Sequence, residues 1–337
     1  MSRHGRRERI DHALFRPRGP LLNPHVQSLL ASSGLRRFSA NLRFPRLHER
    51  SRELILDCGE GVRLQAFHST TTAAPVRGLA LLLHGWEGSV NSSYLLVTAG
   101  RLLAAGFDVV RLNFRDHGDT HHLNPELFHS CRLDEVIGAA LAVQQQFRPR
   151  RMVVAGFSLG GNFALRVALR GPARGLQLDY ALAVCPPIDP AESLRQIERA
   201  PFVYERYFIN KWTASLARKQ ALFPDRYDFR PWLADASLRS LTARLVEEYT
   251  DYGQLERYLD GYSIAGSRLR ELSLPATILT AADDPVIPIG DYHTLDLTAD
   301  TELILSERGG HCGFIEDWRL RSWVEDLIVE RLLRAVE

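Results

Sequence analysis

The feature that most constrains the fold of this chain is an alternation of short apolar runs with longer amphipathic stretches. The apolar runs at 77–85, 107–114, 151–156 and 276–281 have the length of buried strands. Between the first two lies 92–106, whose spacing of apolar residues predicts a helix ending at a glycine. Because alternating strands and helices form right-handed crossovers, the sequence predicts an α/β fold with a mostly parallel sheet covered on both faces.

Other segments extend this pattern towards both ends of the chain. Gly-Glu-Gly separates the runs 52–58 and 62–69, which predicts an antiparallel hairpin at the start of the sheet. Further strands are expected at 180–187 and 302–307. Further helices are expected at 130–147, with Ser130 as the N-cap, at 161–170 and at 317–337.

The segment 190–270 interrupts the alternation, because it is amphipathic and helical throughout and contains no strand pattern. A helical insertion between two strands is most simply a cap over one end of the sheet. We therefore predict an N-terminal extension that packs on the core (1–50), a first core part (51–189), the cap (190–270) and a second core part (271–337).

Composition excludes several classes of protein. The net charge of +2 over 337 residues gives no overall attraction to nucleic acid or to an anionic membrane. The chain contains neither an apolar run of about 18 residues nor an apolar segment of a secretory signal, so no membrane insertion is expected. The four cysteines show no metal-binding spacing, and we expect reduced thiols in a cytoplasmic protein that needs no cofactor.

A serine lies at the turn between a predicted strand and a predicted helix. The sequence there is Gly156-Phe157-Ser158-Leu159-Gly160, directly after the apolar run 151–156. Such a turn lifts its central residue into a strained, exposed position beyond the carboxyl end of the strand, where α/β sheets place their ligands. A glycine turn without catalytic role is the alternative, but the flanking strand and helix favour Ser158 as a nucleophile.

A serine hydroxyl becomes a nucleophile when a histidine, oriented by a carboxylate, takes its proton. With a serine at such a turn, the acid and then the histidine are expected on loops after later strands. Asp283 and Asp284 follow the run 276–281, and His311 lies in a glycine-rich loop after 302–307. We predict Asp284 as the acid and His311 as the base, and leave Asp283 as the alternative acid.

The developing oxyanion needs backbone donors that are already in position. The strand at 77–85 ends in His-Gly, and the next residue, Trp86, is placed to donate its N–H. The residue after the nucleophile, Leu159, supplies the second N–H. Both contributions come from the backbone.

With these residues in view, the chain resembles the α/β-hydrolase superfamily, and more narrowly its YheT-like branch. The motifs that carry the resemblance are NPHVQSLL (23–30), HGWEGSVNSSY (84–94), NFRDHGDT (113–120), GFSLGGN (156–162), DDP (283–285) and GGHCGF (309–314). The resemblance implies a charge-relay triad of Ser158, Asp284 and His311, and esterase, lipase or acyltransferase activity on medium-chain or lipid-like esters.

Two further groups of residues remain open to more than one interpretation. The histidine-rich segment 116–129 suggests a metal site, but it has no regular ligand spacing, so we predict a hydrogen-bonded loop and no metal. The cap aromatics Phe202, Tyr207 and Trp212 could line an acyl pocket or form the core of the cap.

The sequence thus predicts a serine hydrolase that cleaves small-molecule carboxylic esters through an acyl-enzyme. One alternative is an acyltransferase, in which an alcohol replaces water in the second step. An alternative of another class is a non-catalytic binding protein with the same fold.

Overall fold

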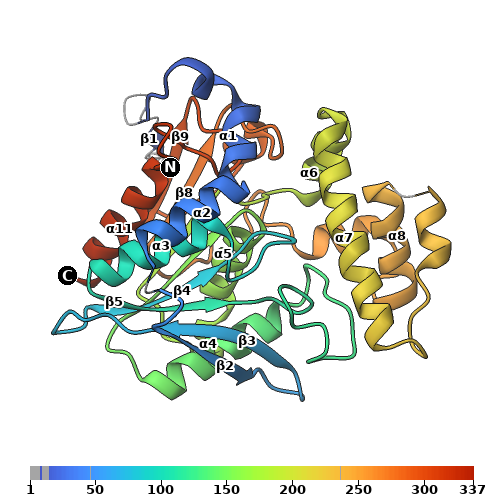
Figure 1. Ribbon diagram of the computed structural model, residues 1–337, viewed down its shortest axis with the longest axis horizontal. Coiled ribbons are helices and arrows are strands. Elements are labelled where there is room, and N and C mark those ends of the chain that lie inside the picture. The colour runs from blue at the N-terminus through green and yellow to red at the C-terminus, as the bar shows by residue number, and fades with distance from the viewer. Residues whose placement is uncertain (1–7, 10–14, 46, 236) are drawn as a thin grey trace, which may run out of the picture.

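The strands of the protein form one sheet in the part of the chain that the structure describes. This computed structural model describes residues 8–9, 15–45, 47–235 and 237–337, so much of the segment examined for a secretory signal lies outside it. The strands are β1 (Glu8–Arg9), β2 (Ser51–Asp57), β3 (Arg63–Ser69), β4 (Gly78–Leu83), β5 (Phe107–Leu112), β6 (Met152–Phe157), β7 (Tyr180–Val184), β8 (Ala276–Ala281) and β9 (Thr301–Ser306). Their order in the sheet is β1-β9-β8-β7-β6-β4-β5-β3-β2 (Figure 1).

The pairing of these strands confirms the predicted mostly parallel sheet. β2 pairs antiparallel with β3, and β3 pairs antiparallel with β5, as expected for a hairpin at one edge. The other pairings among the described strands are parallel.

The helices cover both faces of this sheet. The helices are α1 (Pro24–Ala31), α2 (Gly34–Arg43), α3 (Ser93–Ala104), α4 (Leu133–Phe147), α5 (Leu159–Arg170), α6 (Pro190–Arg199), α7 (Phe202–Leu222), α8 (Leu238–Tyr249), α9 (Leu255–Gly261), α10 (Ile289–His293) and α11 (Trp323–Val336). Successive residues of a strand point to opposite faces. Accordingly, Leu81 packs in one buried cluster with Phe163 of α5, and Leu82 packs in the other with Ile328 of α11. The α/β fold class is therefore confirmed.

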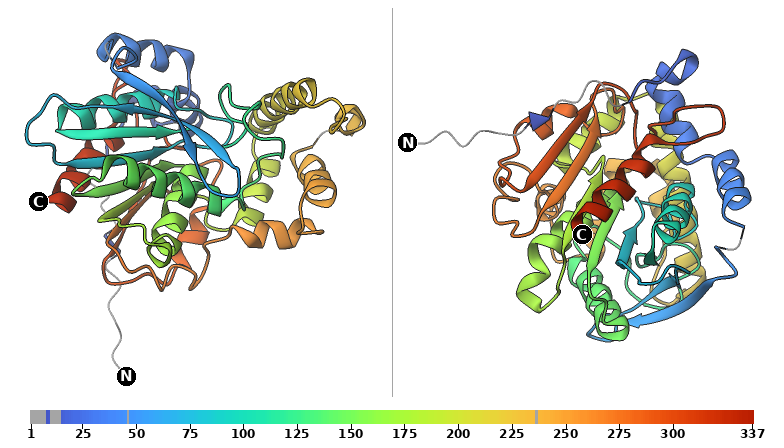
Figure 2. Two further views of the ribbon diagram at one scale, coloured as in Figure 1. Left: turned by 90° about the horizontal axis from the view of Figure 1, so that it is seen from below. Right: turned by 90° about the vertical axis from the view of Figure 1, so that its left-hand side faces the viewer.

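Of the two N-terminal helices, α2 packs on the outside of α3 and α1 lies next to α2 (Figures 1 and 2). Ala40 of α2 is buried in the cluster that α3 and α11 share. Arg36 of α2 and Glu325 of α11 form an ion pair in which both side chains are buried. Ser93 of α3 donates a hydrogen bond to the carbonyl of Ala31, 2.7 Å away. Segments from the two ends of the chain thus pack together on one face of the sheet.

Helices α6 to α9 form a separate layer, which we call the cap, beyond one end of the sheet (Figures 1 and 2). They share an apolar cluster of their own, which includes Trp212, Leu241 and Tyr258. The cap lies between β7 and β8 in the sequence. Among the described helices, none combines the length and the apolar character that crossing a bilayer requires.

Two predicted helix starts are wrong. α4 begins at Leu133 instead of near Ser130, because the Ser130 N–H donates to the Tyr258 hydroxyl and its carbonyl accepts from Arg166. The last helix begins at Trp323, and the residues before it form a turn in which Ile315 pairs with Ser322. Long-range partners took Ser130 out of the first helix, and a local turn delays the start of the last one.

One buried ion pair joins the cap to the core. The ammonium of Lys219 in α7 lies 2.7 Å from Asp116 and donates to the carbonyls of His121 and Asn124. Both charged side chains are nearly inaccessible, at 1% and 6% exposure. Burying two charges is tolerated here because the ammonium has three hydrogen-bond acceptors.

We expect Lys219→Met to destabilise the protein by about 3–5 kcal/mol, because it leaves the carboxylate of Asp116 buried without a counter-charge. The neighbouring Arg218 pairs with Asp119 at the surface and provides a matched control. Arg218→Met should change the stability by less than about 1 kcal/mol. The free energies of unfolding in urea test both values, and equal losses for the two variants would contradict the argument.

Candidate active site

Ser158 lies at the sharp turn between β6 and α5. Its backbone angles of φ 53° and ψ −124° are unfavourable for any residue with a side chain. The turn is possible because strand and helix approach closely at two glycines. A Cβ atom on Gly156 would lie 2.0 Å from the carbonyl oxygen of Gly160. A Cβ atom on Gly160 would lie 2.4 Å from the carbonyl oxygen of His84. The spacing of Gly-x-Ser-x-Gly is thus required by this turn.

Three predicted residues meet at this turn. The Nε2 atom of His311 lies 2.9 Å from the Ser158 hydroxyl oxygen, and its Nδ1 atom lies 2.8 Å from an oxygen of Asp284. The carboxylate, which is 0% exposed, also accepts from the N–H groups of Val286 and Ile287. Since Nδ1 donates to the carboxylate, Nε2 is free to accept the serine proton.

The two adjacent aspartates have different partners. Asp284 contacts the ring of His311, whereas Asp283 accepts a hydrogen bond of 2.9 Å from the backbone N–H of Gly310. Asp283 therefore supports the loop that carries His311 without touching the ring.

The turn after β4 presents Trp86 to the same point. A Cβ atom on Gly85 would lie 3.2 Å from the Cβ of Ser158, so this backbone passes close to the nucleophile. The N–H of Gly85 donates to the Tyr94 hydroxyl, and the N–H of Glu87 donates to Nε2 of His117. Burial lowers the pKa of His117 to about 4, which keeps it neutral as an acceptor.

The N–H groups of Trp86 and Leu159 remain available at this turn. Neither donates a hydrogen bond to any residue that the structure describes. Leu159 is the first residue of α5, so its N–H has no acceptor within the helix. The positive end of the helix dipole favours negative charge there.

Helix α1 holds the loop that carries His311, a role that the sequence did not reveal. The Ser28 hydroxyl accepts from the His311 N–H at 2.8 Å. The fully buried Gln27 donates to the carbonyl of Ile315 and accepts from its N–H. A Cβ atom on Gly310 would lie 2.4 Å from the carbonyl oxygen of Pro24. The motif NPHVQSLL thus supports the His311 loop of the active site, although the two segments lie near opposite ends of the sequence.

A cavity of about 500 Å³ opens above Ser158, with walls from the core turns, the cap and helices α1 and α2. Trp212 and Tyr207 of α7 both line it. The ring of Trp86 stacks on Phe208 at 5.3 Å and meets Trp212 edge-on, so the cap closes over the turn after β4. The apolar lining of the cavity includes Leu194, Ile197, Phe208, Trp212, Leu245 and Leu259.

Phe202 does not join this lining. Its side chain is 83% exposed, and it is not among the described residues that border the cavity. The prediction that Phe202 contacts substrate in this cavity therefore does not fit its position. Phe202 lies in the first turn of α7 and points to solvent. The spacing of aromatic residues in the sequence could not distinguish it from Tyr207 and Trp212, which line the cavity.

The cavity contains a second serine and histidine pair, which the sequence did not indicate. Nε2 of His121 lies 2.8 Å from the Ser215 hydroxyl oxygen, and that hydroxyl donates to the carbonyl of Asp116. The buried Nδ1 of His121 has no hydrogen-bond partner among the described residues, so no carboxylate orients this ring. Burial lowers the pKa of His121 to about 3. Without a carboxylate that orients its ring and stabilises its charged form, His121 lacks the support that Asp284 gives to His311.

Asp116 and His117 of the histidine-rich segment 116–129 are used in separate contacts. Asp116 pairs with Lys219 and accepts from the N–H of Phe128, while Nδ1 of His117 donates to the carbonyl of Arg115. These contacts fit the predicted hydrogen-bonded loop.

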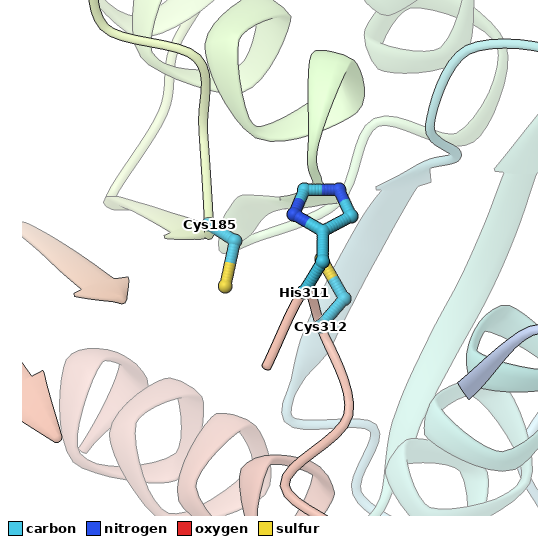
Figure 3. A group of neighbouring side chains, drawn as sticks. All are labelled: Cys185, His311 and Cys312. Carbon is cyan, nitrogen blue, oxygen red and sulfur yellow. The ribbon is translucent and has the colours of Figure 1, made fainter. Parts of the chain in front are cut away.

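Another group of side chains has the composition of a metal site. In the described residues, the ligand atoms of Cys185, His311 and Cys312 lie within 4.8 Å of one another. Figure 3 shows Cys185 at the end of β7 and the other two residues on the loop that faces it. Both ring nitrogens of His311 are already bound to Ser158 and Asp284. An ion held there through the His311 ring would have to displace one of these hydrogen bonds.

The activity should fall as the pH decreases through the pKa of His311. Burial disfavours the charged ring, but the carboxylate of Asp284 and the neighbouring Cys312 together outweigh it, and the pKa of His311 lies well above its ordinary value of 6.5. A protonated ring cannot accept the serine proton, so kcat/KM should rise with pH and level off above this raised pKa. A pH profile of kcat/KM measures the midpoint. A midpoint below 6.5 would contradict this role of the carboxylate.

Comparison with known proteins agrees with this geometry. The sequence matches the Alpha/beta hydrolase family over residues 80–320. It is 28% identical to YheT of Escherichia coli (strain K12) over 96% of this chain and 94% of YheT. It is 23% identical to Phospholipase ABHD3 of Mus musculus, over 82% of this chain and 69% of that protein.

Solved structures show the same fold. The Pyrococcus furiosus esterase Pf2001 superimposes with a TM-score of 0.58 at 13% identity, covering 96% of this chain and 99% of the esterase. Mouse alpha/beta hydrolase domain-containing protein 10 gives a TM-score of 0.52 at 12% identity, covering 85% of this chain and 100% of that one. The chain therefore belongs to the alpha/beta hydrolase family, in its YheT-like branch.

Proposed function

We propose that the protein is a serine hydrolase that cleaves carboxylic esters. The observation that carries this proposal is the continuous hydrogen-bonded line from Asp284 through His311 to Ser158, at the base of a cavity. The strained backbone of Ser158 supports it, because strain of this kind is retained where function requires it. Family membership and relatives with names such as phospholipase support the same reaction class.

In the proposed reaction, the Ser158 oxygen attacks the ester carbonyl while Nε2 of His311 takes the hydroxyl proton. The N–H groups of Trp86 and Leu159 stabilise the negative charge that develops on the carbonyl oxygen. The alcohol leaves with the proton from His311, and an acyl-enzyme remains. Water then attacks the acyl group and gives a proton to His311, which passes it to the leaving Ser158 oxygen, so that the carboxylic acid and the free serine are released.

The cavity suggests which esters fit. Its volume of about 500 Å³ and its aliphatic and aromatic walls suit a medium-length acyl chain or a lipid-like ester. Such a chain would lie against Trp212 and Tyr207 of the cap. The four cysteines are all free thiols, which supports a cytoplasmic location.

A series of p-nitrophenyl esters with increasing acyl length tests this proposal. We expect kcat/KM to rise and then fall with chain length, because longer acyl chains fill the apolar cavity until they exceed it. Adding ethanol distinguishes hydrolysis from acyl transfer, since a transferase would form the ethyl ester in place of the acid. A folded protein that hydrolyses none of the esters would favour the non-catalytic binding protein.

A further inference from the structure

Helix α2 carries three strongly exposed apolar side chains. Leu35, Phe38 and Leu42 of α2 are 70%, 64% and 66% exposed. Their spacing of three and four residues places them on one face of the helix. Leu29 of α1 is also exposed. Soluble proteins seldom expose large apolar side chains side by side unless the surface binds something.

Two neighbouring segments extend this apolar surface. Ser39 and Arg43 of α2 donate to the carbonyl of Arg319, which places the exposed Trp318 next to α2. Nδ1 of His25 in α1 lies 2.9 Å from the Tyr204 hydroxyl of α7, which brings the first turn of α7 against α1. That turn carries the exposed Phe202. We call the exposed apolar residues of α1 and α2, with Trp318 and Phe202, the docking surface.

The docking surface borders the mouth of the cavity. Ser32 and Arg37 line the cavity and are exposed, so they lie where it opens on the side of α1 and α2. Tyr207 and Lys211 of α7, also exposed, line the opening on the side of the cap. An apolar surface that is continuous with the mouth can deliver a ligand directly to Ser158.

The sequence that contains α1 and α2 carries basic residues and no acidic ones. From residue 13 to residue 48, the sequence contains six arginines and no acidic residue, while the whole chain has a net charge of only +2. One of the six, Arg36, is neutralised by Glu325. A basic helix with an apolar outer face is typical of segments that lie in the interface of anionic bilayers.

We propose that the docking surface binds an anionic phospholipid bilayer and holds the mouth of the cavity at the membrane. The exposed side chains of α2 and the ring of Trp318 enter the headgroup region, and the neighbouring arginines contact the lipid phosphates. The bilayer would then be the source from which ester substrates enter the cavity. Binding to the bilayer does not depend on the proposed hydrolysis and can be measured separately.

Co-sedimentation of the full chain with vesicles tests this proposal. We expect the wild type to bind vesicles of phosphatidylcholine mixed with phosphatidylglycerol more tightly than vesicles of phosphatidylcholine alone, and to lose binding as salt is added. The combined variant Leu35→Ser, Phe38→Ser and Leu42→Ser should partition at least about tenfold more weakly. These side chains face solvent, so the variant should fold normally.

A matched control removes the same number of exposed apolar side chains elsewhere. Ile55, Val76 and Leu222 are also exposed, and none belongs to the docking surface. The variant Ile55→Ser, Val76→Ser and Leu222→Ser should bind vesicles as the wild type does. Equal binding by both triple variants, or no binding by the wild type, would overturn the proposal.

Two further measurements separate the alternatives. A wild type that forms a dimer, which the α2 variant dissociates, and that binds no vesicles would identify the surface as an interface between two copies. With p-nitrophenyl acetate in solution, the α2 variant should retain wild-type activity, while its hydrolysis of esters carried in vesicles should fall with its binding. If no ester is hydrolysed by any variant, the proposed function fails while the sedimentation result still decides the docking proposal.

Discussion

Ser158→Ala should reduce kcat by on the order of 10⁴–10⁶-fold with p-nitrophenyl esters, because the variant has no oxygen to form the acyl-enzyme. Labelling by a fluorophosphonate, which reacts with an activated serine, should disappear at the same time. Alanine occupies less space than serine, so the fold and the melting temperature should change little. Initial rates, gel fluorescence and a thermal melt measure the three outcomes.

The second serine of the cavity provides the matched control for this experiment. Ser215 also lies 2.8 Å from a histidine nitrogen, but no carboxylate among the described residues orients that histidine. Ser215→Ala should therefore keep its fluorophosphonate label. A label that survives in Ser158→Ala and is lost in Ser215→Ala would show that the nucleophile has been assigned to the wrong pair.

Asp284→Asn should reduce kcat by about 10⁴-fold while substrate binding changes little. An amide can donate to Nδ1 of His311 and so favour the tautomer whose Nε2 carries a proton, which cannot accept another from Ser158. The loss of the carboxylate also removes the charge that raises the pKa of His311, so the pH midpoint of the residual activity should move down. Steady-state kinetics across pH give both quantities.

Asp283→Asn separates a specific effect from a general disturbance of this loop. The amide that replaces this carboxylate keeps an oxygen that can accept from the Gly310 N–H, so kcat should fall by less than roughly tenfold. A loss as large as that of Asp284→Asn would mean that the support of the His311 loop matters as much as the orientation of the ring.

The fold could be predicted from the sequence because its strands are continuous apolar runs and its helices are amphipathic. β8 begins and ends where the apolar run 276–281 does, since a parallel strand buried on both faces leaves no ambiguity in the pattern. Helix starts were less predictable. Ser130 has the residue type of an N-cap, but the hydroxyl of Tyr258, 128 residues away, takes its N–H.

The residues of the candidate site were also predictable, because each lies in a short motif that the sequence shows directly. A Cβ atom on Gly156 would clash with the backbone of the same turn and one on Gly160 with the backbone of His84, so the motif and its geometry are inseparable. The residues that support this site were not predictable. Gln27 and Ser28 act on a loop more than 280 residues away, and nothing in their own segment reveals that partner.

The sequence by itself determined the order of strands and helices, the turn at Ser158, and the succession of serine, acid and histidine along the chain. These depend on the apolar pattern and on backbone geometry within a few residues. The tertiary structure alone decided which aspartate meets His311, which of two serines has a histidine paired with a carboxylate, and that Phe202 faces solvent while Trp212 faces the cavity. Each of these depends on side-chain contacts between distant segments, and such contacts exist only once the sheet, the cap and the N-terminal helices have packed together.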